Sequence, residues 1–422
     1  INKFAYNMVI NRRNFLTTTI AGGLAATILL SSCRLKVKEQ LYTKLDEAIK
    51  KPVLKSNLFS DPVIIETVEL LNYKNNYICR VRSKDGAEGF SFGNDKMNSL
   101  YPIFVKRVQP FFIGKDARNL EAMLDEVYVY KSNYKLQSVA LWVPIATLEF
   151  AILDMLGRIA NQTIGQLIGE IYNPEIRVYQ ANSERGISAE ETVELIQKQL
   201  EVSQAKAIKF KIGGRMSQPE YPQGRTEKLI PLVRKTFGDD MNISADSNGS
   251  YNVEEAIRIG KIMEEYSYVF YEEPVPFDWY EETKQVSDAL NIPLAGGEQE
   301  GSLRNFRWLL ANDAIQIAQA DMFYFGGMIR SMKVARMAET LGKVHTPHVS
   351  NIGYVYMLHF ISAIPNAGPY HELKTPFNDE MSFECKTSTL LPKDGVVKVP
   401  TDPGLGILFD PDFITKHRVV NC

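Results

Sequence analysis

Two patterns of apolar and polar positions follow one another along this chain. From residue 63 onward, short runs of β-branched and aromatic residues alternate with turn residues such as Asn75-Asn76 and Asp85-Gly86, which predicts a small antiparallel sheet. Its strands are expected at residues 63–72, 77–83 and 89–92. Apolar residues then recur with the period of a helix over residues 100–111, 120–130 and, most strongly, 145–158. A sheet followed by helices is typical of an α+β domain.

From about residue 174 the pattern changes to a regular alternation of strand-like and helix-like segments. Strands are expected at residues 177–181, 207–212, 242–245, 268–271, 292–295, 315–319, 343–346 and 368–370. Helices are expected between them, as at residues 189–200, 228–236, 253–265 and 329–340. This alternation predicts an α/β fold, a closed TIM-like (β/α) barrel with an N-terminal α+β capping domain. The alternative, a doubly wound open sheet, is expected to show a Gly-rich turn after its first strand, and residues 178–182 contain none.

Composition narrows the class of protein without identifying it. The chain has 422 residues, of which 45% are hydrophobic and 23% charged, values that are ordinary for a soluble globular protein with more than one domain. Its formal net charge of -2 indicates no basic stripe, so we expect no nucleic-acid partner. The four cysteines, Cys33, Cys79, Cys385 and Cys422, have no close spacing and imply neither a zinc site nor a disulfide framework.

The first 33 residues are typical of an export signal. Arg12-Arg13 precede Phe15-Leu16, a short apolar run covers residues 17–30, and Leu30-Ser31-Ser32-Cys33 resembles the lipobox of bacterial lipoproteins. We expect an exported, periplasmic lipoprotein with a twin-arginine-like signal, attached to the membrane only through a lipid on Cys33; a Sec signal or an uncleaved anchor is the alternative. Further boundaries are expected at 34–60 for a tether, 61–173 for the capping domain, 174–375 for the barrel and 376–422 for a C-terminal segment packing on the capping domain.

Several predicted barrel strands end in a carboxylate. Asp246, Glu272 and Glu298 each follow an apolar run, and the intervals from 246 to 272 and from 272 to 298 are both 26 residues. Because active sites of such barrels form at the C-terminal ends of the strands, equal spacing is expected to place the three at one height, pointing at a common spot. Converging anions favour a bound cation, and carboxylate ligands without Cys or His favour Mg²⁺ over zinc. The alternative is three solvated loop carboxylates or helix N-caps. A fourth carboxylate, Glu372, follows the eighth strand and completes the ring.

Basic residues are expected on both sides of these carboxylates. Lys209 and Lys211 alternate along the preceding strand and therefore face the same side. Mutual repulsion and partial burial there would lower the lysine pKa toward that of a general base. On the other side, the strands that end at Asp321 and His348 are neighbours, so the aspartate can orient the histidine and raise its basicity. His345, in the same extended run, is the competing candidate.

Taken together, these residues resemble the enolase superfamily, and within it the mandelate racemase group with its acid-sugar dehydratases. The resemblance covers nearly all of the chain from about residue 62. Its motifs occur in order as Lys209-Phe210-Lys211, Asp246-Ser247-Asn248, Glu272-Glu273-Pro274, Gly297-Glu298, Asp321 and His348. What it implies is an enolase-type modified barrel in which Asp246, Glu272 and Glu298 bind Mg²⁺.

The resemblance also implies roles for the residues around that metal. Lys211 would be a base on one face of the substrate, and His348 with Asp321 the acid/base on the other. The substrate carboxylate would be contacted by Lys209 and Asn248, and its enolate form would be hydrogen-bonded by Glu372.

Two bases on opposite faces of a substrate permit either racemisation or dehydration. The resemblance favours a lyase: Mg²⁺-dependent dehydration of an acid sugar, an aldonate or aldarate, to a 2-keto-3-deoxy acid through a metal-stabilised enolate. The alternatives are an isomerase that racemises or epimerises a 2-hydroxy acid, and a non-catalytic lipid-anchored protein that binds sugar acids. The expected partners are a small-molecule carboxylate and further copies of the chain in a homo-oligomer.

Overall fold

The computed structural model describes residues 38–349, 353–374 and 382–421, and it divides the chain into two units, Ile1–Glu47 and Ala48–Cys422. The described part of the first unit, residues 38–47, is helical. The predicted export signal and lipobox, residues 1–33, lie outside the described residues. All elements discussed below belong to the second unit.

The second unit begins with an antiparallel sheet in the order β15-β1-β2-β3. Its strands are β1 (Ile65–Tyr73), β2 (Asn76–Ser83), β3 (Glu88–Phe92) and β15 (Arg418–Val419). The first three confirm the predicted strands. Helix α5 (Val139–Ala160) packs so closely on β3 that a Cβ atom at Gly89 would clash with the carbonyl oxygen of Ala151. Glycine at this position is therefore required by the contact between sheet and helix.

Helices cover this sheet and lead to the barrel. The single helix predicted over residues 100–111 is three pieces, α2 (Met97–Ile103), the π-helical η2 (Phe104–Val108) and α3 (Gln109–Phe112). Pro102 and Pro110 lie in this stretch and lack the backbone N–H of a regular helix, which accounts for the division. Helix α5 is apolar and long enough to cross a membrane, but 89% of its apolar window is buried inside the protein. The remaining elements of this region are η1 (Ser56–Leu58), η3 (Ala117–Asn119), α4 (Leu120–Val129), η4 (Tyr130–Lys135) and α6 (Ile164–Ile168).

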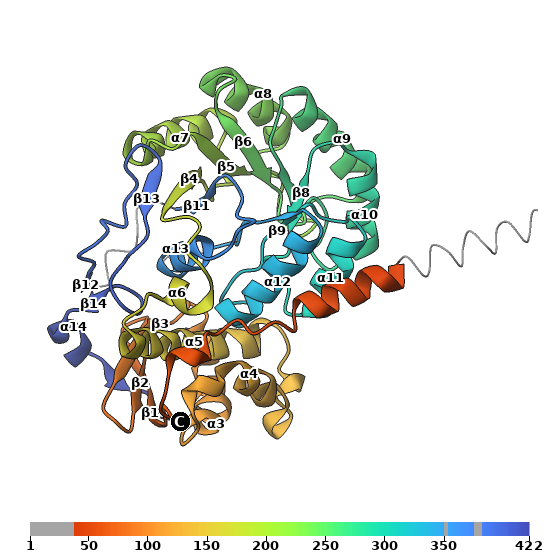
Figure 1. Ribbon diagram of the computed structural model, residues 1–422. Helices are drawn as coiled ribbons and strands as arrows, with labels where there is room; N and C mark the ends of the chain where they lie inside the picture. Colours follow the sequence, from red (N-terminus) through yellow and green to blue (C-terminus); the bar gives the residue numbers. More distant parts are fainter. Residues whose placement is uncertain (1–37, 350–352, 375–381, 422) are drawn as a thin grey trace, which may run out of the picture. The chain divides into compact units, whose positions relative to one another are not determined.

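A curled parallel sheet forms the barrel, and its neighbouring strands follow the order β10-β9-β8-β7-β6-β5-β4-β11. The strands are β4 (Glu175–Ala181), β5 (Ala207–Lys211), β6 (Asn242–Asp246), β7 (Tyr271–Glu272), β8 (Leu294–Gly296), β9 (Ile317–Ala318), β10 (Val344–His345) and β11 (His371–Leu373). Helices surround these strands (Figure 1): α7 (Ala189–Ser203), α8 (Arg225–Phe237), α9 (Val253–Glu265), α10 (Tyr280–Ala289), α11 (Leu303–Ala311), α12 (Met328–Thr340) and α13 (Tyr354–Ser362). The predicted fold class, a (β/α) barrel with an N-terminal capping domain, is confirmed.

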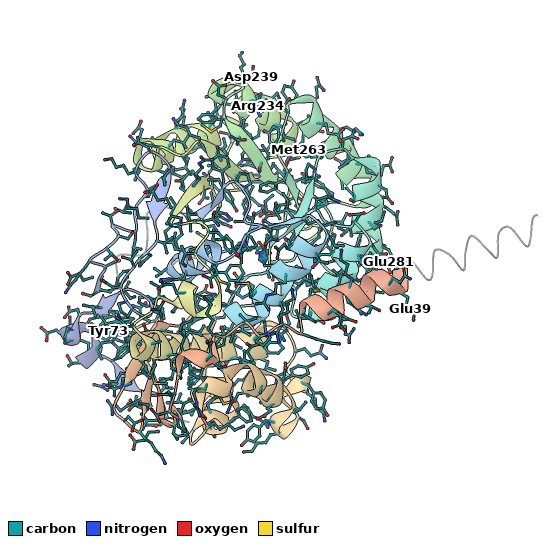
Figure 2. All side chains as sticks on the ribbon, viewed as in Figure 1. Glu39, Tyr73, Arg234, Asp239, Met263 and Glu281 are labelled. Atoms are coloured by element: carbon teal, nitrogen blue, oxygen red, sulfur yellow. The ribbon has the colours of Figure 1, made fainter. Side chains whose placement is uncertain are left out.

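Helix α13 is buried along its whole length, whereas the other barrel helices bury one face against the strands. Met263 of α9 is fully buried and Glu281 of α10 is exposed, and Figure 2 labels both. This division between a buried apolar face and an exposed polar face is the period that the sequence showed.

The eighth barrel strand begins later in the sequence than predicted. Residues 368–370 are not a strand; the strand is β11, at His371–Leu373. Pro369 has no backbone N–H to donate, which explains why regular pairing starts only after it. The residues before β11 nevertheless close the ring, because the His345 amide donates to the Asn366 carbonyl oxygen at 2.9 Å and the Gly368 amide donates to the His345 carbonyl oxygen at 3.2 Å.

Part of the predicted tether, residues 34–60, is inside the second unit. Val53 and Leu54 are buried in its core, and their amides donate to Glu121 Oε1 at 2.6 and 2.7 Å. A free spacer would leave these apolar side chains in water, so the part of the predicted tether from Ala48 onward belongs to the folded unit.

The C-terminal segment contacts both halves of the second unit. β15 pairs with β1 of the antiparallel sheet, and β13 (Val396–Lys398) pairs antiparallel with β4 of the barrel. The Leu405 amide donates to Asp154 Oδ1 of α5 at 2.7 Å. Its other elements are β12 (Phe383–Glu384), β14 (Leu408–Phe409) and α14 (Pro411–Thr415).

Candidate active site

Three buried carboxylates converge at the C-terminal ends of neighbouring barrel strands. Asp246 and Glu272 are the last residues of β6 and β7 and lie opposite each other in the pairing of these strands. Glu298 follows β8 by two residues. One carboxylate oxygen from each of the three lies within 4.8 Å of the others. The structure thus brings together the predicted metal ligands.

Equal spacing in the sequence does not mean equal height in the barrel. The residue of β8 that pairs with Glu272 is Ala295, not Glu298. Glu298 reaches the other two carboxylates through a turn at Gly297, whose φ of +105° lies in the region that glycine adopts readily. A Cβ atom at Gly297 would also clash with the ring of Phe306. The expectation that strand spacing alone aligns the three residues is therefore corrected.

The electrostatics of this cluster fit a cation with oxygen ligands. Burial, followed by repulsion from Asp246, raises the pKa of Glu272 to about 7. Within the described residues, Glu298 Oε2 is buried and makes no hydrogen bond. Clustered carboxylates with an unsatisfied buried oxygen are costly unless positive charge is added between them. Their donor set is all oxygen, which suits a hard divalent ion such as Mg²⁺.

Lys209 and Lys211 both point toward these carboxylates from β5, as strand alternation predicted. Lys209 Nζ lies 2.7 Å from Glu272 Oε2 and 3.3 Å from Glu372 Oε2, and it is almost fully buried. Lys211 forms an ion pair with Asp246 and donates to Asn248 Oδ1 at 3.0 Å. The lysine prediction was wrong in one respect, because the pKa of Lys209 is raised: burial would lower it, but Glu272 and Glu372 outweigh that effect.

His348 and Asp321 form the predicted pair. His348 Nδ1 lies 2.7 Å from Asp321 Oδ2, and Nε2 lies 3.4 Å from Glu298 Oε2. Asp321 Oδ1 accepts the backbone amides of Phe323 and Tyr324 at 2.7 and 2.9 Å, which fixes the carboxylate. Burial alone would lower the pKa of His348, but Glu298, Glu372 and Asp321 raise it to about 9. The imidazole is therefore oriented on one side and open toward the carboxylate cluster on the other.

The competing candidate, His345, belongs to the core. Its ring packs on Phe360 of α13, with centroids 5.3 Å apart, and neither ring nitrogen has a hydrogen-bond partner among the residues that the structure describes. Burial lowers the pKa of His345 to about 3, so this side chain is neutral at physiological pH. A buried histidine without a charged partner is a packing residue, and the geometry supports His348 instead.

Glu372 and Asn248 complete the arrangement, together with residues that the sequence reasoning missed. Asn248 Nδ2 donates to Asp246 Oδ2 at 3.2 Å and to Glu298 Oε1 at 3.4 Å. The missed residues contact these groups directly: Gln319 donates to Glu272 at 2.8 Å, Lys374 lies 3.0 Å from Glu372, and Arg185 donates to Asn248 at 2.8 Å. Strand alternation could have found two of them, since Gln319 is two positions from Asp321 and Lys374 two from Glu372. Arg185 lies in a loop and has no such signal.

Comparison with known proteins agrees with this geometry. The model of the family described as Enolase C-terminal domain-like matches residues 191–413. The arabinonate dehydratase of Saccharolobus solfataricus is 25% identical over 333 residues, which cover 77% of this chain and 86% of that protein.

Solved structures share the fold over nearly their whole length. The 3,6-anhydro-D-galactonate cycloisomerase from Zobellia galactanivorans superposes with a TM-score of 0.69 at 26% identity, covering 86% of this chain and 100% of that one. A mandelate racemase/muconate lactonizing protein from Paracoccus denitrificans PD1222, solved in complex with magnesium, has a TM-score of 0.77 at 22% identity and covers 85% of this chain and 99% of its own.

Proposed function

This chain belongs to the enolase superfamily, and from that premise we propose that it dehydrates an acid sugar, an aldonate or aldarate, to a 2-keto-3-deoxy acid. The observation that carries the proposal is the cluster of Asp246, Glu272 and Glu298 with a basic residue at either end. The similarity to an arabinonate dehydratase supports an acid sugar as the substrate class.

In the proposed reaction, the two basic residues act on opposite faces of the substrate. Lys211 contacts Asp246 at one end of the carboxylate cluster, and His348 Nε2 faces Glu298 at the other. Because Asp321 engages Nδ1 of His348, Nε2 is the ring nitrogen that takes or gives a proton. One base removes the α-proton, and an acid donates a proton to the β-hydroxyl, which leaves as water. The resulting enol takes up a proton at the β-carbon and becomes the keto acid.

The remaining groups manage the charge of the substrate. Mg²⁺ would be held by Asp246, Glu272 and Glu298, and when bound it supplies positive charge that favours loss of a proton beside a carboxylate. Lys209 and Asn248 are the groups that hold the substrate carboxylate. Their bonds to Glu272, Glu372 and Asp246 fix their side chains before the substrate arrives, so little ordering remains to be done on binding.

Racemisation or epimerisation of a 2-hydroxy acid is the second candidate. It is favoured by the same placement of Lys211 and His348 at opposite ends of the cluster, because a base on each face can remove and return one α-proton. Similarity to a cycloisomerase shows that this fold also carries isomerases.

A screen of aldonates and aldarates tests the proposal. The Mg²⁺-loaded protein is incubated with each acid in D₂O, and deuterium at the α-carbon and 2-keto product are followed by NMR. Keto product from one or a few acids supports dehydration, and epimer without keto product supports the isomerase. Tight binding of an acid sugar with neither exchange nor product would refute both, in favour of a protein that binds sugar acids without turnover. Glu298→Gln is the matched control for metal-independent background.

A further inference from the structure

A buried arginine in the first turn of α12 joins two loops that carry site residues. Arg330 Nε donates to the Phe325 carbonyl oxygen at 2.7 Å, and Nη2 donates to the Gly301 carbonyl oxygen at 3.0 Å. Gly301 and Glu298 lie in the loop after β8. Phe325 and Asp321 lie in the loop after β9. One planar guanidinium thus connects the loop of a proposed metal ligand to the loop that orients the acid/base histidine.

Hydrogen bonds inside each loop pass this restraint on to the functional side chain. The Phe325 amide donates to the Asp321 carbonyl oxygen at 2.8 Å, so the residue that is tied at its carbonyl also anchors the backbone of the aspartate. In the other loop, the Glu300 amide donates to the Gly297 carbonyl oxygen at 3.1 Å and closes a turn around Glu298. Neither side chain can move far while its loop is held.

The separation of the two loops determines the geometry of the site. Asp321 of one loop lies 2.7 Å from His348 Nδ1, and Glu298 Oε2 of the other lies 3.4 Å from His348 Nε2. A misplacement of about 1 Å can cost about 10²-fold in rate. A group that fixes this separation therefore affects catalysis without contacting a substrate.

The surroundings of Arg330 offset the cost of burying its charge. The guanidinium carbon lies 3.7 Å from the centroid of the Trp142 ring, which belongs to α5 of the capping domain, and 4.8 Å from that of Phe325. A Cβ atom at Gly326 would clash with the Trp142 ring, so the capping helix and the loop after β9 are in close contact. Burial lowers the pKa of Arg330 to about 10, which leaves the side chain charged at neutral pH.

We propose that Arg330 is a positioning residue, which sets the separation of Glu298 and His348 by tying the loops after β8 and β9 to each other. A lysine at this position would keep the charge, but its single nitrogen does not reproduce the fork of donors that reaches both carbonyl oxygens. The effect on exchange rests on the proposed function, whereas the effect on Mg²⁺ affinity can be measured without a substrate.

The test compares Arg330→Ala and Arg330→Lys with the wild type and with Arg304→Ala, an exposed arginine that lines the same cavity. Exchange is measured at saturating Mg²⁺ on paired epimers of an acid sugar found in the screen above. On the face served by His348, we expect a loss of about 10²-fold in Arg330→Ala and about 10-fold in Arg330→Lys. On the face served by Lys211, the loss should be only a few-fold, because Lys211 lies on β5 and contacts neither loop carbonyl. Arg304→Ala should match the wild type.

Chemical rescue separates the loss of the tie from a general defect in folding. Arg330 lines a cavity of about 560 Å³, so Arg330→Ala leaves a guanidinium-sized space that is continuous with this cavity. Ethylguanidinium should restore exchange in Arg330→Ala about 10-fold, whereas ethylammonium should not, and neither compound should change the wild type. Rescue by both compounds, or by neither, would overturn the proposal.

Calorimetry provides a readout other than turnover. Arg330→Ala should weaken Mg²⁺ binding about 10-fold because Glu298 is held less firmly, and Arg304→Ala should leave it unchanged. Full exchange in Arg330→Lys, equal losses on both faces with Mg²⁺ bound, or unchanged Mg²⁺ affinity in Arg330→Ala would also overturn the assignment. If circular dichroism shows that Arg330→Ala is unfolded, Arg330→Lys carries the test with the same expected difference between faces. If the wild type exchanges no acid, the proposed function fails, and the Mg²⁺ measurement still decides the role of Arg330.

Discussion

Replacing Asp321 with asparagine should inactivate His348 without removing it. In the wild type, Oδ1 of Asp321 accepts two backbone amides, from Phe323 and Tyr324, and Oδ2 faces His348 Nδ1 at 2.7 Å. In Asp321→Asn the amide oxygen must remain at the two backbone N–H groups, so the amide NH₂ is turned toward Nδ1. A neutral imidazole can then accept that hydrogen bond only if its own proton is on Nε2. Nε2 is consequently unable to take a proton from the substrate.

The size of the expected loss of activity follows from this forced tautomer of His348. The same substitution in a serine-protease triad lowers kcat about 10⁴-fold with the geometry retained, and we expect a loss of about 10³-fold or more for exchange on the face served by His348. Exchange on the face served by Lys211 should fall only a few-fold, because Lys211 contacts Asp246 and Asn248 rather than Asp321.

Paired epimeric acid sugars separate the two faces. Deuterium incorporation at the α-carbon is measured for each epimer with the wild type, Asp321→Asn and Asp313→Asn, an exposed aspartate that serves as control. Magnesium occupancy is confirmed in all three proteins. Equal loss on both faces with metal retained, or no loss on either, would show that His348 and Lys211 do not each serve one face of the substrate.

Three further predictions test other parts of the molecule. Chelation should abolish activity and Mg²⁺ should restore it, and Glu298→Gln should weaken metal binding measured by calorimetry; activity in the metal-free protein would contradict the site. The buried histidines His345, His359 and His371 have pKa values lowered by burial to about 3, 4 and 4, below the unfolded value of about 6.5, so each contributes stability that is complete above about pH 6.5 and is lost as the pH falls toward 4. The free energy of unfolding measured with urea should be lower at pH 5 than at pH 7.5 by about 2 kcal/mol per histidine. The same drop should be smaller in His359→Gln, which lacks one of the three. Finally, the lipobox prediction implies that Cys33→Ser releases the protein from the membrane fraction, and continued attachment would instead indicate an uncleaved anchor.

The sequence predicted the order of elements well because hydrophobic period responds directly to burial. The barrel strands and helices appear where alternation placed them, except where one residue overrides the pattern. Pro369 delays the eighth strand to His371, and Pro102 and Pro110 divide a helix that periodicity made continuous. Such exceptions could have been read from the prolines themselves. The burial of Val53 and Leu54 could not, since they are an adjacent apolar pair between Pro52 and Lys55, and two adjacent positions define no period.

The sequence was enough to predict which residues form the candidate site, but not how their charges interact. Residue type and strand position were enough to find Asp246, Glu272 and Glu298, because the ends of parallel strands meet at one edge. The direction in which the pKa of Lys209 shifts could not be predicted, since it depends on the distances from Lys209 to Glu272 and Glu372 on other strands. Spacing along the chain carries no information on which oxygen faces which nitrogen.

Charged side chains around the barrel mouth form a connected network, so the effects of substituting them should be coupled. Lys209 contacts both Glu272 of the proposed metal site and Glu372, which in turn contacts Lys374. A change at Lys209 is therefore expected to weaken metal binding and substrate recognition together. Substitutions at Lys209 and Glu298 should be non-additive in the free energy of Mg²⁺ binding, because Lys209 contacts Glu272, which lies in one carboxylate cluster with Glu298.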